Sequence, residues 1–371
     1  MAELQTQMLT INMGPQHPST HGVLRVELVT DGEIVERAIP HIGYLHRCFE
    51  KHAENIDYMG VMPFVDRMDY VASMNNDMAY AMAVEKLAGI EVPKRAEYIR
   101  VIMAELNRIA SHLLAVGTYG LDIGTFTPFM WCFRDREYIL DIFEMASGAR
   151  LLYNYLWIGG VWMDVTPGIQ EKIAEFCDYF EPKLDELDTI LSYNQIFINR
   201  TKNVGILPLD LAINYGITGP NLRGSGKKWD LRKDTPYSVY PELEFDIPIG
   251  LGEQGSIGDC WDRYIVRVRE MRESLKIVRQ ALKKIPEGPF RAKVSRIKPP
   301  AGEVFLKTEN PRGELGFYLV STGDVKPYRV KAKSPCFTSI SCLDDLCKGV
   351  MIADVVAIIG SLDIVLGEVD R

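Results

Sequence analysis

The alternation of apolar and polar residues predicts a β-hairpin near the start of the chain. Residues 23–29 and 33–36 alternate in this way, and Asp31-Gly32 between them is a strong two-residue turn signal. We therefore expect a small N-terminal β-hairpin lobe over about residues 14–40.

Five later stretches repeat apolar residues every three or four positions, which is the spacing of one face of an α-helix. Proline stands at or near the start of three of them, where its fixed φ angle is compatible with the first helical turn. The stretches cover about residues 66–87, the segment from Pro93 through Leu113, and about residues 128–153, 167–194 and 262–284. Several long helices in succession favour a helical bundle as the core.

The remaining segments lack this helical period. Residues 199–256 are rich in Gly and Pro, so we expect irregular loops there, whereas residues 304–308 and 316–320 read as strands and about 343–359 as a final helix. No linker separates two halves. The pattern predicts an α+β, mainly helical fold, with residues 1–371 as a single compact domain. Its parts are the hairpin lobe, a helical core over about 48–285, and a C-terminal β lobe with the final helix over about 287–371.

Composition and charge exclude several classes of protein. Apolar residues make up 47% and charged residues 25%, as in a soluble globular protein, and the net charge of −8 disfavours a nucleic-acid partner. The most apolar stretch, 351–367, is interrupted by Asp354 and Asp363, and residues 1–14 lack a basic start, so we expect neither a membrane span nor a secretory leader. The seven cysteines form no CxxC pair, and we interpret them as reduced thiols in the cytoplasm.

Histidine chemistry is confined to the N-terminal third, because all six histidines lie within the first 112 residues. His17 and His21 stand four residues apart, but Pro18 and Gly22 argue against a helix and favour a loop. Such a loop could present a proton donor to a cleft, and the commoner alternative is that both histidines cap backbone groups.

Four other polar residues are candidate site residues, but none of them is decisive by itself. Tyr70 begins a predicted helix, where a tyrosine usually packs with its hydroxyl at the surface, and Arg47 and Arg67 would by default be surface charges. Asp122 stands among apolar and Gly residues, so it could cap a turn or be a partly buried acid.

Familiar cofactor motifs are missing from the sequence. No GxGxxG follows a strand, and the Gly- and Lys-containing loop at 224–228 fails the phosphate-loop spacing. That loop belongs to a basic patch, which could be solvated or could dock an acidic partner; its members are Arg223, Lys227, Lys228, Arg232 and Lys233. Cys336, Cys342 and Cys347 lack iron–sulfur spacing, and we expect them to be buried as small hydrophobic residues.

Nine motifs taken together point to one family. In order they are GPQHPSTHGVLR (14–25), HIGYLHR (41–47), RMDY (67–70), AVEKL (83–87), RIASHL (108–113), TPF (127–129), IGGV (158–161), WDLRK (229–233) and GEVDR (367–371). Over essentially its whole length the chain resembles the D-subunit family of bacterial NADH–quinone oxidoreductase, respiratory complex I. This family shares its fold with the large subunit of nickel–iron hydrogenases, which bind their metal through one CxxC near each end. No cysteine stands in 63–70 or 363–371, so a nickel–iron centre and a hydrogenase are both excluded.

The resemblance implies a quinone pocket in place of the metal. It assigns the head-group contacts to His21 and Tyr70, the acid coupled to His21 to Asp122, and a supporting position in the same loop to His17. An imidazolium and a phenol are suitable hydrogen-bond donors for a carbonyl oxygen on which charge develops. The function implied is that of the quinone-site subunit of a proton-pumping NADH–quinone oxidoreductase, active only in the complex.

The resemblance also implies partners and a location. Electrons would arrive from the terminal iron–sulfur cluster of a neighbouring subunit, close to Arg47 and Arg67, and this chain would itself bind no NADH, flavin or metal. Further partners would be the other peripheral-arm subunits and a membrane-arm subunit at the quinone entrance. The chain would lie peripherally on the cytoplasmic side of the cell membrane, the inner membrane.

One departure from the family pattern bears on the choice of quinone. Many members carry a His two residues after a Gly-Ala-Arg motif, where this chain has Leu152. Loss of a titratable cation there predicts a lower, less pH-sensitive cluster potential, which favours menaquinone. Two alternatives remain: the same role in a ferredoxin-fed complex of this family, and a non-catalytic, hydrogenase-derived scaffold.

Overall fold

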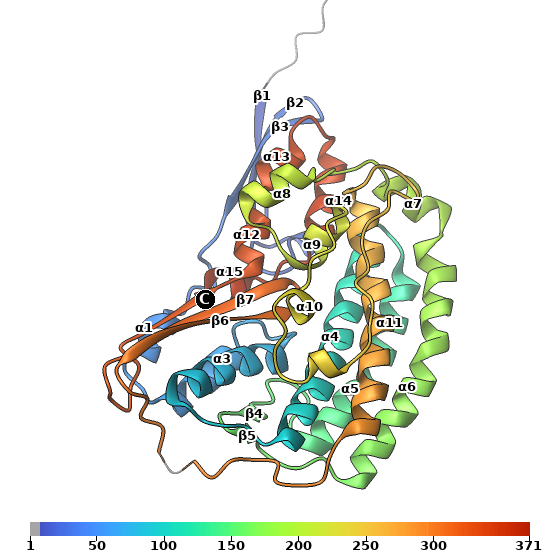
Figure 1. Ribbon diagram of the computed structural model, residues 1–371. Coiled ribbons are helices and arrows are strands. Elements are labelled where there is room, and N and C mark those ends of the chain that lie inside the picture. Colours follow the sequence, from blue (N-terminus) through green and yellow to red (C-terminus); the bar gives the residue numbers. More distant parts are fainter. Residues whose placement is uncertain (1–7, 295) are drawn as a thin grey trace, which may run out of the picture.

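Four long helices run alongside one another and form the centre of the molecule (Figure 1). The computed structural model describes residues 8–294 and 296–371. The central helices are α4 (Lys94–Asp122), α5 (Phe126–Ser147), α6 (Pro167–Leu187) and α11 (Cys260–Lys284). The predicted bundle and the α+β, mainly helical class are thus confirmed.

Helix α4 is buried on its polar face as well as on its apolar stripe. Ile99, Ile102 and Leu106 are fully buried as the spacing predicted, yet Glu105 and Arg108 are fully buried too. Apolar periodicity identifies only the first face, because a buried charged face depends on partners from distant segments.

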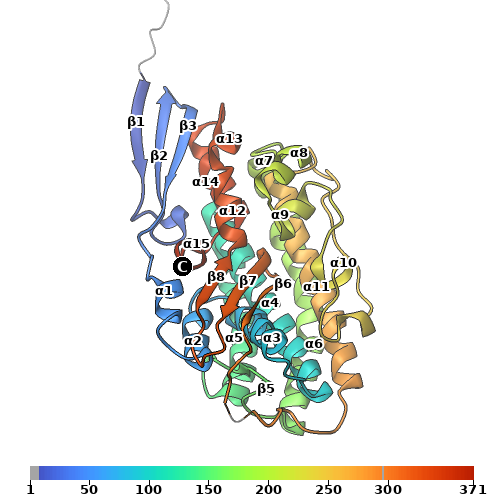
Figure 2. The same cartoon turned by 60° about the vertical axis from the view of Figure 1, so that its left-hand side comes forward.

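The N-terminal lobe is a three-stranded antiparallel sheet that packs against α13 and stands apart from the bundle in Figure 2. Its strands are β1 (Met8–Met13), β2 (Arg25–Asp31) and β3 (Ile34–His41). The predicted hairpin is confirmed, but Asp31 pairs with Ile34, so the turn is Gly32-Glu33, one residue later than expected. The register of the two strands shifts between Val29 and Thr30. The prediction also missed β1.

Several elements outside the bundle, and the ends of two helices within it, differ from what the periodicity predicted. The expected helix over 66–87 is divided by residues 67–72, and the long helices α5 and α6 end earlier than expected. The elements outside the bundle in this part of the chain are α1 (Phe49–Ala53), α2 (Tyr58–Asp66), α3 (Ser73–Ala88), β4 (Leu156–Trp157) and β5 (Gly160–Val161). Helix α5 stops at Gly148, whose φ of +80° ends the helix, and α6 continues as a π-helical turn over Asp188–Ser192.

The segment 199–256 is less irregular than expected. It contributes α7 (Gln195–Thr201), α8 (Leu209–Tyr215), α9 (Gly219–Gly224) and α10 (Leu231–Asp234). Each is too short for its apolar spacing to show a helical period. The expected basic patch is also wrong: Lys227, Lys228 and Lys233 are exposed, but Arg223 and Arg232 are buried in ion pairs.

The C-terminal lobe contains both predicted strands in an antiparallel sheet beside α3. The expected final helix is divided at residues 348–351, where Gly349 adopts a φ of +77°. The elements are β6 (Gly302–Asn310), β7 (Gly313–Ser321), β8 (Arg329–Lys333), α12 (Pro335–Ser341), α13 (Leu343–Cys347), α14 (Ile352–Leu362) and α15 (Leu366–Asp370). None of the described helices combines the length and the apolar character that crossing a membrane requires.

Candidate functional site

The loop that carries His17 and His21 is shaped by a glycine and a 3-10 turn. Gly14 has a φ of +86°, and a Cβ atom there would lie 2.1 Å from the carbonyl oxygen of Leu24, so no larger residue fits. The turn Pro18–Thr20 follows, and His17 caps it because its Nδ1 accepts a hydrogen bond of 3.2 Å from the Ser19 N–H. The capping alternative therefore applies to the side chain of His17 and not to that of His21.

His21 forms a close ion pair with Asp122, although 101 positions separate them. Its Nε2 lies 2.5 Å from Oδ2 of Asp122, the last residue of α4. The side chains are 17% and 6% exposed. Burial lowers the pKa of His21, but the hydrogen bond and charge of Asp122, with the charge of Asp363, outweigh burial and raise the pKa above its ordinary value. The arrangement favours an imidazolium whose other nitrogen remains for a ligand.

Tyr70 lies in the connection between α2 and α3 and is 36% exposed. Burial of the ring and then the neighbouring Asp69 charge raise the pKa of the phenol, which keeps it protonated. The ring packs against α15, since a Cβ on Gly367 would lie 3.3 Å from Tyr70 Cε1. The His21 loop reaches the same helix, because a Cβ on Gly22 would lie 3.3 Å from Leu366 Cδ1. Adjacent residues of α15 thus hold both predicted donors on one side of the molecule.

A buried ionic triad behind these donors was not predicted. Arg312 Nη1 donates to Asp69 Oδ2 at 2.8 Å, and Arg312 Nη2 donates to Asp363 Oδ1 at 3.1 Å. All three side chains are nearly inaccessible to water. Asp69 directly precedes Tyr70, and Asp363 interrupts the apolar stretch near the C-terminus. Both acids could therefore have been recognised as candidate site residues from the sequence. Nothing in the sequence pointed to Arg312, which lies in the tight turn between β6 and β7.

Arg47 and Arg67 lie together on the surface. Arg47 Nη2 donates a 2.6 Å hydrogen bond to the carbonyl oxygen of Arg67, whose own guanidinium donates to that of Pro63 at 3.0 Å. Both side chains are exposed. The segment of Arg47 is pinned to the chain end, because Asp370 accepts hydrogen bonds from the backbone of Gly43 and Leu45. The pair offers positive charge to a ligand or partner outside this chain.

An open hollow of about 810 Å³ lies along the histidine loop. It is lined by Pro15, Gln16, His17, Pro18, Gly22 and Val23. Its lining is mostly apolar, which suits an apolar ligand with few polar groups. A second cavity, of about 760 Å³, shares none of the predicted site residues and lies among Trp157, Trp162 and residues 289–294, 296 and 297.

The cysteines do not gather into a metal site in the part of the chain that the structure describes. There, no group of three or more His, Cys, Asp or Glu side chains is arranged to hold a metal ion. Cys336, Cys342 and Cys347 are buried, as expected. Cys336 lies at the site, where its backbone N–H donates to Glu368 Oε2 at 3.2 Å.

Comparisons with known proteins agree with the motif pattern. The family model described as "Respiratory-chain NADH dehydrogenase, 49 Kd subunit" matches residues 122–299 and 290–371. The D subunits of NADH-quinone oxidoreductase from Chlorobium luteolum and Chlorobaculum tepidum are each 59% identical over all of this chain, covering 95% and 94% of their own lengths. The corresponding protein from Prosthecochloris aestuarii is 58% identical, again over all of this chain and 94% of its own length.

Proposed function

This chain belongs to the family of NADH–quinone oxidoreductase D subunits, and from that membership we propose that it forms the quinone-binding wall of its complex. It is thus a subunit of an oxidoreductase complex whose substrate is a quinone. The observation that carries the proposal is the buried His21–Asp122 pair, 2.5 Å apart, in a loop that borders an open apolar hollow and packs, like Tyr70, against α15.

In the proposed reaction the quinone takes up two electrons and two protons and becomes a quinol. His21 donates one proton from the ring nitrogen that Asp122 leaves free, and the Tyr70 hydroxyl donates the other. Hydrogen-bond donors that are already held beside the quinone carbonyl oxygens stabilise the negative charge that develops there, because the donors need not reorganise during the reaction. Asp122 favours the imidazolium beforehand, and His17 holds the loop by capping its turn. The imidazole and phenolate left behind then regain protons from solvent.

The electrons come, in this proposal, from the terminal iron–sulfur cluster of a neighbouring subunit near Arg47 and Arg67. This chain binds no NADH, flavin or metal of its own. The pocket is completed by the iron–sulfur subunit and by a membrane-arm subunit at the quinone entrance, within a peripheral arm on the cytoplasmic side of the inner membrane. Two exposed guanidiniums on an otherwise acidic chain support such a contact with a negatively charged cluster.

Menaquinone is the favoured substrate in this proposal because of Leu152. The half-buried Leu152 offers no titratable charge at this position. We expect the cluster potential of the assembled complex to change little between pH 6 and pH 8, and a redox titration with a steep pH dependence would contradict this.

The test is electron transfer to quinone by the membrane complex carrying His21→Ala, with either NADH or reduced ferredoxin as donor. A native gel establishes assembly, and His52→Ala, an exposed histidine stacked on Phe64, is the matched control. We expect the His21 variant to assemble and to lose most of its quinone-reductase activity with either electron donor. The control should keep its activity. Full activity in assembled His21→Ala complex would instead support the non-catalytic scaffold.

A further inference from the structure

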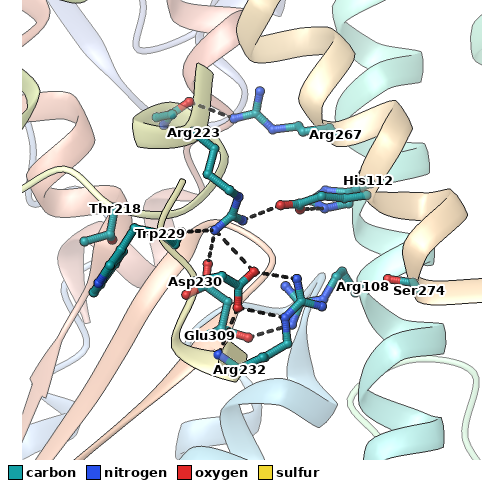
Figure 3. Close-up of polar contacts among 12 residues, drawn as sticks. Arg108, His112, Thr218, Arg223, Trp229, Asp230, Arg232, Arg267, Ser274 and Glu309 are labelled. Atoms are coloured by element: carbon teal, nitrogen blue, oxygen red, sulfur yellow. Dashed lines mark hydrogen bonds and ion pairs between the residues drawn. The ribbon is translucent and has the colours of Figure 1, made fainter. Parts of the chain in front are cut away.

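A second cluster of charged side chains lies inside the bundle, away from the histidine loop (Figure 3). It joins α4, α9, α10, α11 and β6, and every member is at most 2% exposed. The members are Glu105, Arg108, His112, Arg223, Asp230, Arg232, Glu270 and Glu309. Four carboxyl groups therefore face three guanidiniums within this cluster, with Arg267 one turn from Glu270, and a balancing proton would lower the negative charge that is buried there.

Three of the carboxyl groups are strongly stabilised as anions. Glu105 accepts hydrogen bonds from the side chains of Arg108, Arg232, Ser274 and Tyr240. Burial opposes ionisation of Glu105, but the two guanidiniums outweigh it and lower its pKa to about 2. Asp230 is held by Nε and Nη2 of Arg232 and has its pKa lowered to about 2 against the effect of burial. Glu270 pairs with Arg223 and His112, which lower its pKa despite burial.

The ionised form of Glu309 is less strongly stabilised than those of the other three carboxyl groups. Its Oε1 accepts from Arg223 Nη1 at 2.8 Å and its Oε2 accepts from the Leu231 N–H at 3.2 Å. Burial and then the charge of Asp230 raise its pKa to about 7. The charged and titratable groups that face it are Arg108 from α4, Arg223 from α9, Asp230 and Arg232 from α10, Glu270 from α11 through Arg223, and Tyr237 beside its backbone.

His112 is a poor place for the balancing proton. Its Nε2 lies 2.8 Å from Glu270 Oε2, while its buried Nδ1 has no hydrogen-bond partner among residues 8–294 and 296–371. A second proton on the ring would create a buried N–H without an acceptor. Burial also lowers its pKa. Glu309 is therefore the member of the cluster that can take up the balancing proton.

A line of buried groups connects this cluster with the donors. Arg267, one turn before Glu270 on α11, has its Nε 3.6 Å from Asp363 Oδ2, and Asp363 pairs with Arg312. Arg312 Nη1 also donates to Ser111 Oγ at 3.0 Å, next to His112 on α4. Charges buried along such a line are little screened by salt, so a change at one end alters proton affinity at the other.

We propose that Glu309 binds an exchangeable proton inside the bundle and takes it up when the donors at the pocket lose theirs. The coupling rests on the proposed function. When His21 and Tyr70 give protons to the quinone, positive charge near Asp363 falls, and the Glu309 carboxylate binds a proton from solvent to form an O–H bond. The proton leaves again when the donors are reprotonated, so no electrons and no further reactant are needed.

Time-resolved infrared difference spectroscopy of the membrane complex during quinone reduction tests this directly. The unaltered complex should show a carbonyl band of a newly protonated buried carboxyl group that shifts in heavy water, and Glu309→Gln should lack it. Asp230→Asn, which removes the charge that raises the pKa of Glu309, should keep the band but require a lower pH for it. A band that persists in Glu309→Gln overturns the proposal. If that variant does not assemble, the absence of any such band from the unaltered complex overturns it instead.

A second measurement separates this inference from the function on which it rests. In the His21→Ala complex, a pH titration without reduction should still protonate the buried carboxyl group near neutral pH, while the reduction-induced band should be largely lost. A retained reduction-induced band in an inactive His21→Ala complex would refute the coupling. An active His21→Ala complex would refute the proposed function, and the pH titration would then decide whether the Glu309 proton site stands alone.

Discussion

The two ionic regions of this molecule differ in whether a ligand from outside can reach their polar groups. At the site, Tyr70 is 36% exposed and His21 engages only one ring nitrogen, so both donors are left with capacity for a ligand. In the bundle, Glu105 alone accepts hydrogen bonds from four side chains, and water is excluded. The contrast teaches that polar groups beside a hollow stay available to a ligand, whereas buried charges in the core interact with one another.

The largest effect should come from breaking the bundle cluster. Arg223→Met would leave the carboxylates of Glu270 and Glu309 without their shared guanidinium, which costs about 3–5 kcal/mol for a buried pair. We expect the complex to assemble poorly on a native gel. Lys227→Met, an exposed cation four positions along, is the control and should change stability by at most about 0.5 kcal/mol. Equal damage in both variants would remove the contrast between core and surface charge.

The next largest effect should come from the site itself. Tyr70→Phe removes the hydroxyl and keeps the ring that packs against α15, so the complex should assemble normally. We expect quinone reduction to slow by about 10²-fold, the lower end of what a positioned proton donor contributes. Turnover of the purified complex measures this, and unaltered turnover would show that Tyr70 is not a proton donor.

A change in pH dependence should follow from Asp122→Asn. Asp122 raises the pKa of His21 against the effect of burial, so the imidazolium persists above the ordinary pH range of histidine and is lost as pH rises through the raised value. Without the carboxylate burial is the largest remaining influence, opposed by the charge of Asp363, and the alkaline decline of activity should begin at lower pH. Activity profiles between pH 5.5 and 9 would reveal the shift, with the largest loss at high pH. A uniform loss at every pH would argue that Asp122 only shapes the loop.

The smallest effect should come from the loop cap. His17→Ala removes the acceptor for the Ser19 N–H, and a lost cap costs about 1 kcal/mol, which is roughly a fivefold change in KM for quinone. His17→Asn restores a capping oxygen and should recover most of the loss. If neither variant differs from the unaltered complex, the hollow does not depend on the order of this turn.

Most of the long elements could be predicted, because each buries an apolar stripe whose spacing is local. The helix from Lys94, the helix ending at Lys284 and the strands 304–308 and 316–320 were all found in this way. The helices within 199–256 were missed because four to seven residues make no readable period, and β1 because it pairs at an exposed edge with β2. The two wrongly placed members of the basic patch, Arg223 and Arg232, have their partners on other elements.

The motifs and spacings along the chain are enough to identify the family, the long helices and the candidate proton donors. The tertiary structure alone decided which charges meet. It brought Asp122 to His21 across 101 positions, placed Arg312 between Asp69 and Asp363, and matched four buried carboxyl groups with three guanidiniums. The physical reason is that the energy of a buried charge depends on its neighbours in space, and those neighbours come from distant parts of the chain.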